Sequence, residues 1–262
     1  MNEPLQRHGV LLDIDGVLHV GNEAVDGATE VLQWLRAREV PHRFITNTST
    51  RTAEALAEQL GGMGLDVTAD QIFSAVTATQ RYLQDRGHQR PLLIVNDTVR
   101  AAFSKADSDP EDPDCVVIGD IGPRWNHALL DRLFRALMQG AELIAMHRNR
   151  YWQRAEGLCL DIGCYVAGLE YAAQVEATVV GKPNAAFFQF AAADMALDPA
   201  QCLMVGDDID SDVAGAQAAG IRGLLVQTGK YRDTALQRAA ATPDAVLPSI
   251  AALPDWLQAE GG

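Results

Sequence analysis

Hydrophobic and polar positions follow a recurring order along the chain. Short apolar runs end in polar residues, and longer amphipathic segments follow them. The first such run is 10–12, which ends at Asp13; similar runs occupy 43–46 and 202–206. A short apolar run bounded by turn residues is typical of a buried strand. Strands that alternate with helical segments predict an α/β fold with a parallel sheet.

The same pattern predicts the remaining elements. Helices are expected over 28–38, 51–63, 76–86 and 125–138, and further strands over 91–96, 115–120 and 142–146. The strands between 91 and 146 lack polar ends like those of the first run. We therefore expect a doubly wound, Rossmann-like core formed by 1–75 plus 178–262, and an inserted α/β domain over 76–177.

Four strand ends carry candidate chemistry. The first delivers Asp13 and Asp15 just before Gly16, at the carboxyl edge where open α/β sheets place their sites. Two carboxylates this close repel each other unless a positive charge, usually a divalent cation, lies between them. The other three strand ends supply Thr46 and Asn47, then Lys182, and finally Asp207, Asp208 and Asp212.

The order of these residues resembles the haloacid dehalogenase superfamily of phosphotransferases. A large insertion between Thr46 and Lys182 is similar to the C2-type (class IIA) cap of that superfamily. The segments 150–172 and 177–183 are most similar to the group of the phospholysine phosphohistidine inorganic pyrophosphate phosphatase and its relatives, the p-nitrophenyl phosphatases.

The resemblance implies a role for each residue. Asp13 is the expected nucleophile, which forms an aspartyl-phosphate, and Asp15 is the expected acid and base. Asp207 is expected to bind Mg²⁺ together with Asp13 and the main-chain carbonyl of Asp15. The remaining expected roles are phosphate binding by Thr46, Asn47 and Lys182, and orientation of the metal's waters by Asp208 and Asp212. Asp210 is interpreted as a helix N-cap.

Substrate choice is expected to lie in the inserted domain. The loop 146–157 forms either a substrate-binding cluster or a solvated loop with a hydrophobic anchor. Its basic and aromatic residues are His147, Arg148, Arg150, Tyr151, Trp152 and Arg154. Asp161 either contacts the substrate or shapes the turn before the next helix. His19 and Asn22, just after the first strand, are candidates to face the same cavity.

Composition and charge limit the classes of partner that this chain can bind. The chain has 262 residues and a net charge of -14, which argues against nucleic acid or an anionic membrane as a partner. No stretch approaches the roughly 18 apolar residues of a membrane span, and no targeting segment is evident, so a cytoplasmic location is expected. The four cysteines (Cys115, Cys159, Cys164 and Cys202) are scattered, which favours buried thiols over a zinc site or disulfides.

These features predict a Mg²⁺-dependent phosphatase that acts on a small phosphoester, phosphoramidate or pyrophosphate. One alternative is a phosphatase for protein phosphohistidine or phospholysine. A second alternative is a non-enzymatic phospho-acceptor switch of the receiver type, but the interval between Thr46 and Lys182 is longer than one crossover of such a domain needs. The resemblance also implies a homodimer formed through the inserted domain.

Overall fold

The computed structural model describes residues 8–103, 110–154 and 157–260. The chain forms two compact units. The core unit consists of Met1–Thr46, Ala53–Phe73 and Lys182–Gly262, and the inserted unit consists of Asn47–Thr52 and Ser74–Gly181. These ranges differ from the expected boundaries by a few residues, and they assign the short segment Asn47–Thr52 to the inserted unit.

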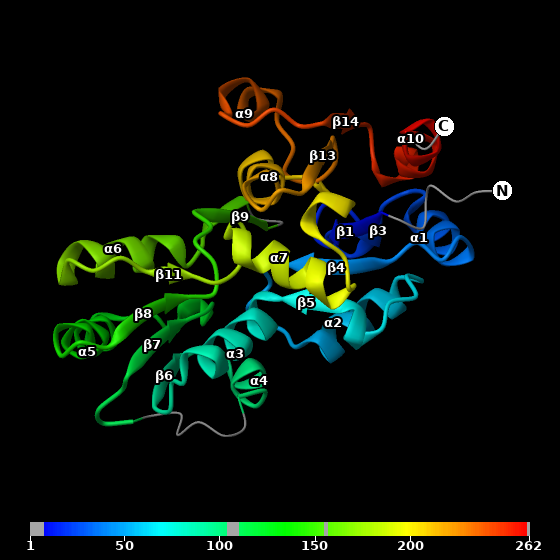
Figure 1. Ribbon diagram of the computed structural model, residues 1–262. Helices are drawn as coiled ribbons and strands as arrows, with labels where there is room; N and C mark the ends of the chain where they lie inside the picture. Colours follow the sequence, from blue (N-terminus) through cyan, green and yellow to red (C-terminus); the bar gives the residue numbers. More distant parts are fainter. Residues whose placement is uncertain (1–7, 104–109, 155–156, 261–262) are drawn as a thin grey trace. The chain divides into compact units, whose positions relative to one another are not determined.

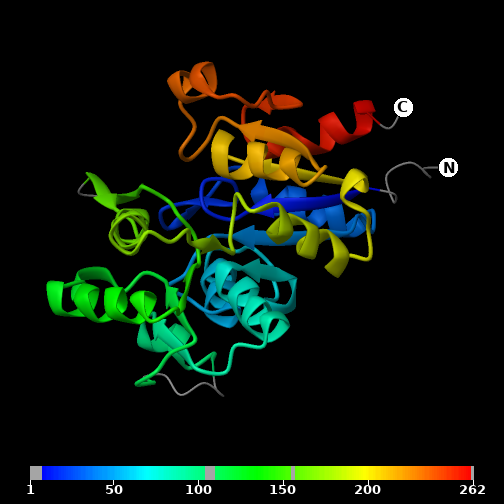
Figure 2. The same cartoon turned by 60° about the vertical axis from the view of Figure 1, so that its left-hand side comes forward.

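The core unit is built on a six-stranded sheet of order β14-β13-β12-β1-β4-β5. Its strands are β1 (Gly9–Asp13), β4 (His42–Thr46), β5 (Ile72–Ser74), β12 (Cys202–Gly206), β13 (Arg222–Val226) and β14 (Ala245–Leu247). The pairs from β14 to β4 are parallel. β1 and β4 lie side by side (Figure 1), and Figure 2 shows the dark-blue β1 between the gold to orange strands and the lighter blue β4. This arrangement confirms the expected doubly wound core.

Helices cover both faces of this sheet. They are α1 (Ala28–Ala37), α2 (Ala53–Gly62), α7 (Ala185–Asp194), α8 (Gly215–Ala218), α9 (Asp233–Arg238) and α10 (Leu253–Glu260). α1 buries Val31, Leu32 and Leu35 in one cluster with Val10 and Leu12 of β1. These two strand residues are two positions apart and therefore point to the same face. α7 contacts β1 and α8.

The inserted unit has its own four-stranded parallel sheet, of order β11-β8-β7-β6. The strands are β6 (Pro91–Ile94), β7 (Cys115–Ile118), β8 (Glu142–Ala145) and β11 (Thr178–Val179). The helices are α3 (Ala75–Arg86), α4 (Asp97–Arg100), α5 (His127–Met138) and α6 (Gly163–Ala173).

Alternation along β7 explains how these helices are distributed. Val116 and Ile118 pack in a cluster with α5 and α6, whereas Cys115 and Val117 pack in another cluster with α3 and α4. Successive residues of a strand point to opposite faces, so the inserted sheet is covered on both sides. Each unit therefore has a hydrophobic core of its own.

The prediction of a loop over 146–157 was wrong in part. Tyr151–Arg154 forms strand β9, which pairs antiparallel with β10 (Gly157–Leu160). The aromatic residues Tyr151 and Trp152 favour a strand, but the basic residues around them hide the alternation of a hairpin. A second, shorter hairpin of β2 (His19–Val20) and β3 (Glu23–Ala24) follows β1.

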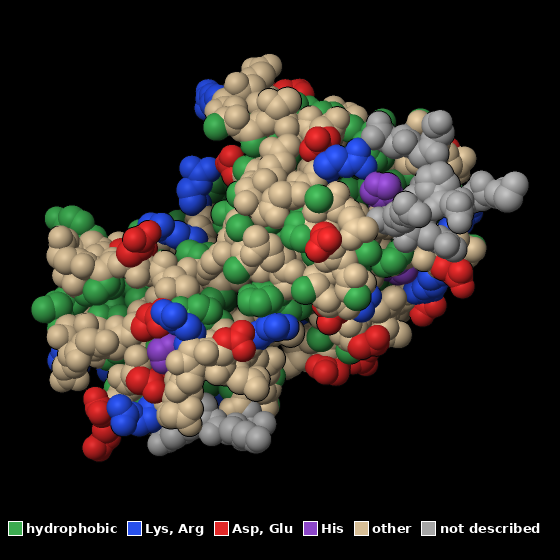
Figure 3. All heavy atoms as spheres, viewed as in Figure 1, with side chains coloured by type: hydrophobic (Ala, Val, Ile, Leu, Met, Phe, Trp, Pro, Cys, Tyr) green, Lys and Arg blue, Asp and Glu red, His purple; other side chains and the backbone are tan. Residues whose placement is uncertain are grey.

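Short helical turns complete the chain. They are η2 (Ala69–Gln71), η3 (Gly122–Arg124), η4 (Pro199–Gln201), η5 (Ile209–Ala214) and η6 (Ile250–Ala252), of which η5 is a π-helix. Among the described residues, none of the helices has the length and apolar character needed to cross a membrane. Acidic and basic side chains are interspersed on the face in view in Figure 3.

Candidate active site

Three neighbouring strands of the core sheet end in polar residues at one edge. Asp13 is the last residue of β1 and Thr46 the last of β4, while Asp207 directly follows β12. β12, β1 and β4 are adjacent and parallel, so their carboxyl ends meet. All three side chains are buried. The sheet thus brings together residues that lie far apart in sequence.

Lys182 joins this cluster. Its Nζ lies 2.7 Å from Asp13 Oδ1 and 2.7 Å from Asp212 Oδ1, and all three side chains are buried. Burial opposes the charge of the ammonium, but the two carboxylates outweigh it and raise the pKa of Lys182. Lys182 is therefore a buried, paired cation.

Asp212 lies within the π-helix η5 and has several partners. Besides the ion pair with Lys182, its Oδ2 accepts hydrogen bonds of 3.1 Å from the backbone N–H groups of Asp207 and Asp208. Asp212 thereby fixes both the ammonium and the turn that carries Asp207. These partners occupy both oxygens of Asp212 and leave little capacity for the expected contact with the metal's waters.

The N-cap of η5 is Asp208, not Asp210. Asp208 Oδ1 accepts hydrogen bonds from the backbone N–H groups of Asp210 and Ser211, at 3.0 and 3.1 Å. Asp210 lies inside the helix and is exposed. The interpretation of Asp210 as the cap was wrong because the helix begins two residues earlier than the aspartate spacing indicated.

Asp207 lies in a cradle made by two glycines. A Cβ on Gly16 or on Gly229 would collide with Asp207 Oδ2, and both glycines have positive φ, 89° and 58°. The backbone N–H of Lys230 donates a 2.6 Å hydrogen bond to the same oxygen. Thr228 Oγ1 donates to the carbonyl of Gly16 at 2.5 Å, which ties the two glycine turns together.

Sequence reasoning missed Gly229 and Lys230. The signal that could have found them is the polar end of the strand 222–226, followed by Thr228, Gly229 and Lys230. Partial burial opposes the charge of the Lys230 ammonium, but Asp207 first and Asp13 second raise its pKa. Lys230 therefore adds positive charge at the same sheet edge.

The donor set fits a divalent cation. Asp13, Asp207 and Asp212 each offer an oxygen, and these three atoms lie within 4.8 Å of one another. Asp207 Oδ1 is buried and has no hydrogen-bond partner among the described residues. Because Asp212 is engaged by nitrogen donors, Asp13 and Asp207 are the side chains that could hold the ion. Oxygen-only ligands suit a hard cation.

The electrostatics agree with this interpretation. Burial first, then Asp212 and Asp207, raises the pKa of Asp13 well above its usual range, although Lys182 acts in the opposite direction. Burial and Asp212 raise the pKa of Asp207 to about 7. The three carboxylates carry more negative charge than the two lysines neutralise, so a bound divalent cation would favour their ionised forms.

Asp15 lies differently from Asp13. Its side chain is 55% exposed, and its Oδ1 is 3.6 Å from Nε2 of the buried His19 in β2. Nδ1 of His19 is 3.0 Å from the carbonyl of Gly21, to which it donates in the matching tautomer. That hydrogen bond leaves Nε2 directed at Asp15. The hairpin thus places a titratable partner beside the expected acid and base.

The expected substrate residues of the inserted unit have partners within that unit. His147 Nε2 lies 3.2 Å from Ser49 Oγ, Arg148 pairs with Glu170 at 2.6 Å, and the guanidinium of Arg150 lies 5.8 Å from the ring centre of Tyr151. The structure does bring His147 and Asp161 together, because His147 Nε2 lies 3.9 Å from Asp161 Oδ1 and both side chains are buried. Asn47, the expected phosphate ligand after Thr46, belongs to the inserted unit.

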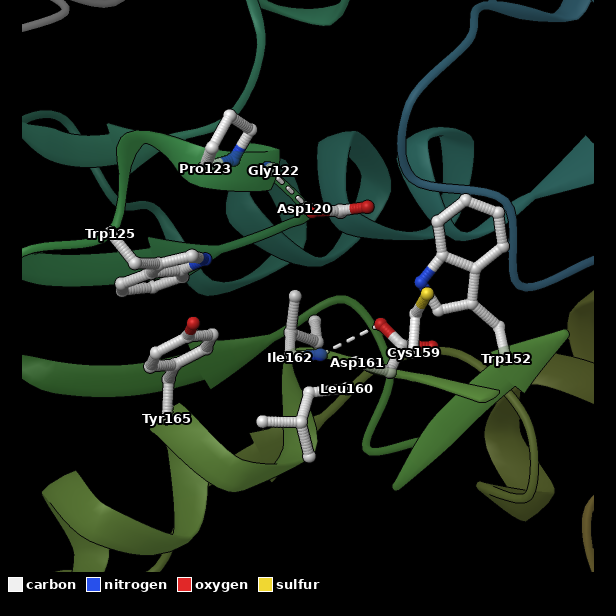
Figure 4. A pocket seen from close by; sticks show the side chains of 10 residues that line it. All are labelled: Asp120, Gly122, Pro123, Trp125, Trp152, Cys159, Leu160, Asp161, Ile162 and Tyr165. Carbon is white, nitrogen blue, oxygen red and sulfur yellow. Dashed lines mark hydrogen bonds between the residues drawn. The ribbon is translucent and has the colours of Figure 1, made fainter. Parts of the chain in front are cut away.

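Asp161 does line a pocket, of about 270 Å³. Figure 4 shows Trp125 and Tyr165 on one side, where their rings stack with centres 4.0 Å apart, and Trp152 on the other. Asp120 and Asp161 supply carboxylates to the pocket. Asp120 Oδ1 accepts a hydrogen bond from the backbone N–H of Gly122, and Asp161 Oδ1 accepts one from that of Ile162. Asp161 therefore accepts a backbone hydrogen bond in the turn before α6 and also lines a cavity. Sequence reasoning named Trp152 as a candidate but missed Trp125 and Tyr165.

Comparison with known proteins identifies the family. The family model for haloacid dehalogenase-like hydrolases matches residues 10–109, and a model described as HAD-hyrolase-like matches 179–253. A bovine relative, "Haloacid dehalogenase-like hydrolase domain-containing protein 2", is 44% identical over 223 residues, which is 85% of each chain. The chain belongs to the haloacid dehalogenase-like hydrolases.

Other relatives of this hydrolase are phosphatases by name. The zebrafish phospholysine phosphohistidine inorganic pyrophosphate phosphatase is 38% identical over 253 residues, covering 94% of this chain and 93% of the relative. The crystal structure of 4-nitrophenylphosphatase from Thermotoga maritima matches with a TM-score of 0.89 at 27% identity, covering 96% of this chain and 98% of that one. The p-nitrophenyl phosphatase from Archaeoglobus fulgidus matches with a TM-score of 0.87. These matches identify the hydrolase as a phosphatase with a core and an inserted cap domain.

Proposed function

We propose that this hydrolase is a Mg²⁺-dependent phosphatase that cleaves a small phosphorylated metabolite through an aspartyl-phosphate on Asp13. The observation that carries the proposal is the contact of Asp13 Oδ1 with Lys182 Nζ, at 2.7 Å, beside Asp207, whose buried Oδ1 has no hydrogen-bond partner in the part of the chain that the structure describes. This combination provides a nucleophile, a fixed positive charge and a place for a hard cation.

Asp13 performs the first step in this proposal. Its Oδ1 is held by Lys182 and by the backbone N–H of Ile14, at 2.7 and 2.8 Å, which leaves Oδ2 for attack on phosphorus. The new bond joins Oδ2 to phosphorus while the bond from phosphorus to the leaving group breaks. Asp15 gives its proton to the leaving group.

The second step regenerates the carboxylate of Asp13. Asp15 removes a proton from water, the water oxygen bonds to phosphorus, and the bond from phosphorus to Asp13 Oδ2 breaks. Bound to Asp13 and Asp207, Mg²⁺ would offset the charge of the phosphoryl oxygens. Lys182, Thr46 and the amides near Asn47 are the proposed phosphate contacts, and Asp208 and Asp212 hold the turn that carries Asp207.

Substrate choice is assigned to the inserted unit, with Asp161 and the pocket of Figure 4 as its main element. The relative named for phospholysine, phosphohistidine and pyrophosphate favours phosphoramidates and pyrophosphate alongside phosphoesters as substrates. The same name supports the second candidate, a phosphatase for phosphorylated proteins. A homodimer formed through the inserted unit is also part of the proposal, and light scattering at several concentrations tests it.

The test is steady-state phosphate release with Mg²⁺ and with chelator. The panel holds p-nitrophenyl phosphate, phosphoglycolate, sugar phosphates, nucleotides, pyrophosphate, phosphohistidine and a phosphohistidine-bearing protein. The proposal predicts turnover that requires Mg²⁺ and that Asp13→Asn abolishes. Turnover that is unchanged by chelator or by Asp13→Asn would overturn it, and a clear preference for the phosphoprotein would establish the second candidate.

A further inference from the structure

A second cluster of metal-binding side chains lies in the inserted unit. His88, Asp114 and Cys115 each offer one donor atom, and these three atoms lie within 4.8 Å of one another. His88 follows α3, and Asp114 and Cys115 meet at the start of β7. This cluster contains nitrogen, oxygen and sulfur donors, whereas the catalytic cluster contains carboxylates alone.

The carboxylate of Glu142 orients the ring of His88. Its Nε2 lies 2.9 Å from Glu142 Oε2, while Glu142 Oε1 accepts hydrogen bonds from Tyr82 at 2.6 Å and from Thr178 at 2.8 Å. Burial opposes the charge of Glu142, but these hydrogen bonds outweigh it and lower its pKa. The N–H at Nε2 donates a hydrogen bond to the ionised Glu142, so Nδ1 is directed at Asp114. A histidine that binds metal is usually held in this way.

Asp114 presents one oxygen toward His88 and interacts with Cys115. Its Oδ2 accepts hydrogen bonds from the backbone N–H groups of Gln89 and Arg90, at 2.7 and 3.0 Å. Its Oδ1 is buried, lies 3.5 Å from His88 Nδ1 and has no hydrogen-bond partner among the described residues. A buried carboxylate oxygen without a hydrogen bond is costly unless an ion satisfies it.

Cys115 completes the donor set. It is fully buried, and burial followed by the neighbouring Asp114 raises its pKa, which keeps it a thiol in the metal-free protein. Asp114 and His88 have side chains that are 28% and 13% exposed, so an ion has a route from solvent. The scattered positions of cysteines in the sequence gave no sign of this arrangement, because His88 is 27 residues before Cys115.

We propose that His88 Nδ1, Asp114 Oδ1 and Cys115 Sγ bind one divalent transition-metal ion, with Zn²⁺ as the ion that suits them. Imidazole, carboxylate and thiolate are the donors that zinc takes in proteins, and Mg²⁺ has little affinity for sulfur. On binding, Cys115 releases its thiol proton to solvent and its sulfur bonds to the ion. The site holds the end of α3 to the start of β7 within the inserted unit.

The plain alternative is a charged cluster without metal, in which a protonated His88 bridges Glu142 and Asp114. The two arrangements differ in the role of the Cys115 sulfur. In the charged cluster Cys115 is a spectator, whereas in the metal site its thiolate is a ligand. Cobalt(II) used in place of zinc distinguishes them, because a thiolate ligand gives a sulfur-to-cobalt charge-transfer absorption in the near ultraviolet.

The experiment titrates the metal-free protein with Co²⁺ in excess Mg²⁺ and then displaces the cobalt with Zn²⁺. We expect one equivalent to give the charge-transfer band and Zn²⁺ to abolish it. Cys115→Ser should lose the band. Cys202→Ser is the matched control, because Cys202 is also buried at the start of a strand, β12, and should keep it.

Variants that leave the sulfur in place guard against a folding defect in Cys115→Ser. His88→Asn should lose the band, and Glu142→Gln should weaken Zn²⁺ binding roughly 10- to 100-fold, as expected for a residue that orients a ligand. No band in the wild type, a band retained in Cys115→Ser, or Zn²⁺ affinity unchanged in His88→Asn would overturn the proposal. Phosphate release is measured separately, so neither result decides the proposed function.

Discussion

The carboxylate of Asp212 lies 2.7 Å from the ammonium of Lys182, the same ammonium that contacts Asp13. Asp212 is therefore a positioning residue, since it acts on the reaction through Lys182 and through the backbone that carries Asp207. The contribution of the ion pair between Asp212 and Lys182 can therefore be measured through protein stability, before the substrate is known.

Asp212→Asn should lower the free energy of unfolding by about 3 kcal/mol, because it removes one partner of a buried charge. It should also lower kcat, since Lys182 loses one of its two anchors. Asp210→Asn, in the same helix but exposed, should stay within about 0.5 kcal/mol of the wild type. Urea denaturation checks both values. Equal stability of the two variants would contradict the role given to Asp212.

Gly229→Ala should weaken Mg²⁺ binding roughly tenfold or more, because its Cβ would displace the carboxylate of Asp207, and such displacements of supporting groups cost about this much. Gly64→Ala is the control. Gly64 also has a positive φ, of 80°, but nothing lies within 4 Å of an added Cβ. Calorimetric titration with Mg²⁺ separates the collision with Asp207 from the cost of a positive φ. Similar affinities in the two variants would refute the cradle.

His19→Asn should lower kcat roughly tenfold and change its pH profile while leaving KM nearly unchanged, as a loss of part of the acid–base contribution. The reason is that Nε2 of the buried His19 faces Asp15 Oδ1 at 3.6 Å and positions that carboxyl group. The measurement is kcat and KM between pH 5 and pH 9. A profile that is identical to the wild type would remove His19 from the mechanism.

His42 should make the fold less stable in acid. Burial, reinforced by Arg36 and Arg43, lowers its pKa, although the carbonyl of Val40 opposes this shift by accepting a hydrogen bond from Nδ1. The native state therefore keeps His42 neutral, whereas the unfolded chain binds a proton below about pH 6.5. The contribution of neutral His42 to the free energy of unfolding is complete above about pH 6.5, and it is lost as the pH falls toward the pKa of His42 in the native state.

The check is the urea midpoint at several pH values between about 5 and 8. His42→Asn should have a smaller dependence on pH than the wild type. His127→Asn is the comparison, because His127 is 89% exposed and should keep the dependence of the wild type. An unchanged pH dependence in His42→Asn would contradict this explanation.

The sequence predicted the parts of this protein that depend on local order. Apolar runs that end in Asp13, Thr46 and Asp207 predicted the strands and the sheet edge, because parallel strands in one sheet place their carboxyl ends together. The α/β core and the inserted domain are confirmed by the fold and by its structural relatives.

What the sequence did not reveal depends on contacts between distant segments. Nothing local shows that Lys182 pairs with Asp212, that Gly229 approaches Asp207, or that His88 meets Cys115. The cap of η5 was misplaced because several aspartates compete for that position within a few residues. The aromatic pocket was missed because Trp125 and Tyr165 belong to segments that only the fold stacks together.

The proposed mechanism depends on covalent phosphorylation of Asp13. An acid quench during turnover of substrate labelled on phosphorus, followed by peptide mapping, detects this intermediate. We expect transient label on the peptide that contains Asp13, released by hydroxylamine and absent in Asp13→Asn. Turnover without labelled protein, or label that persists in Asp13→Asn, would contradict it.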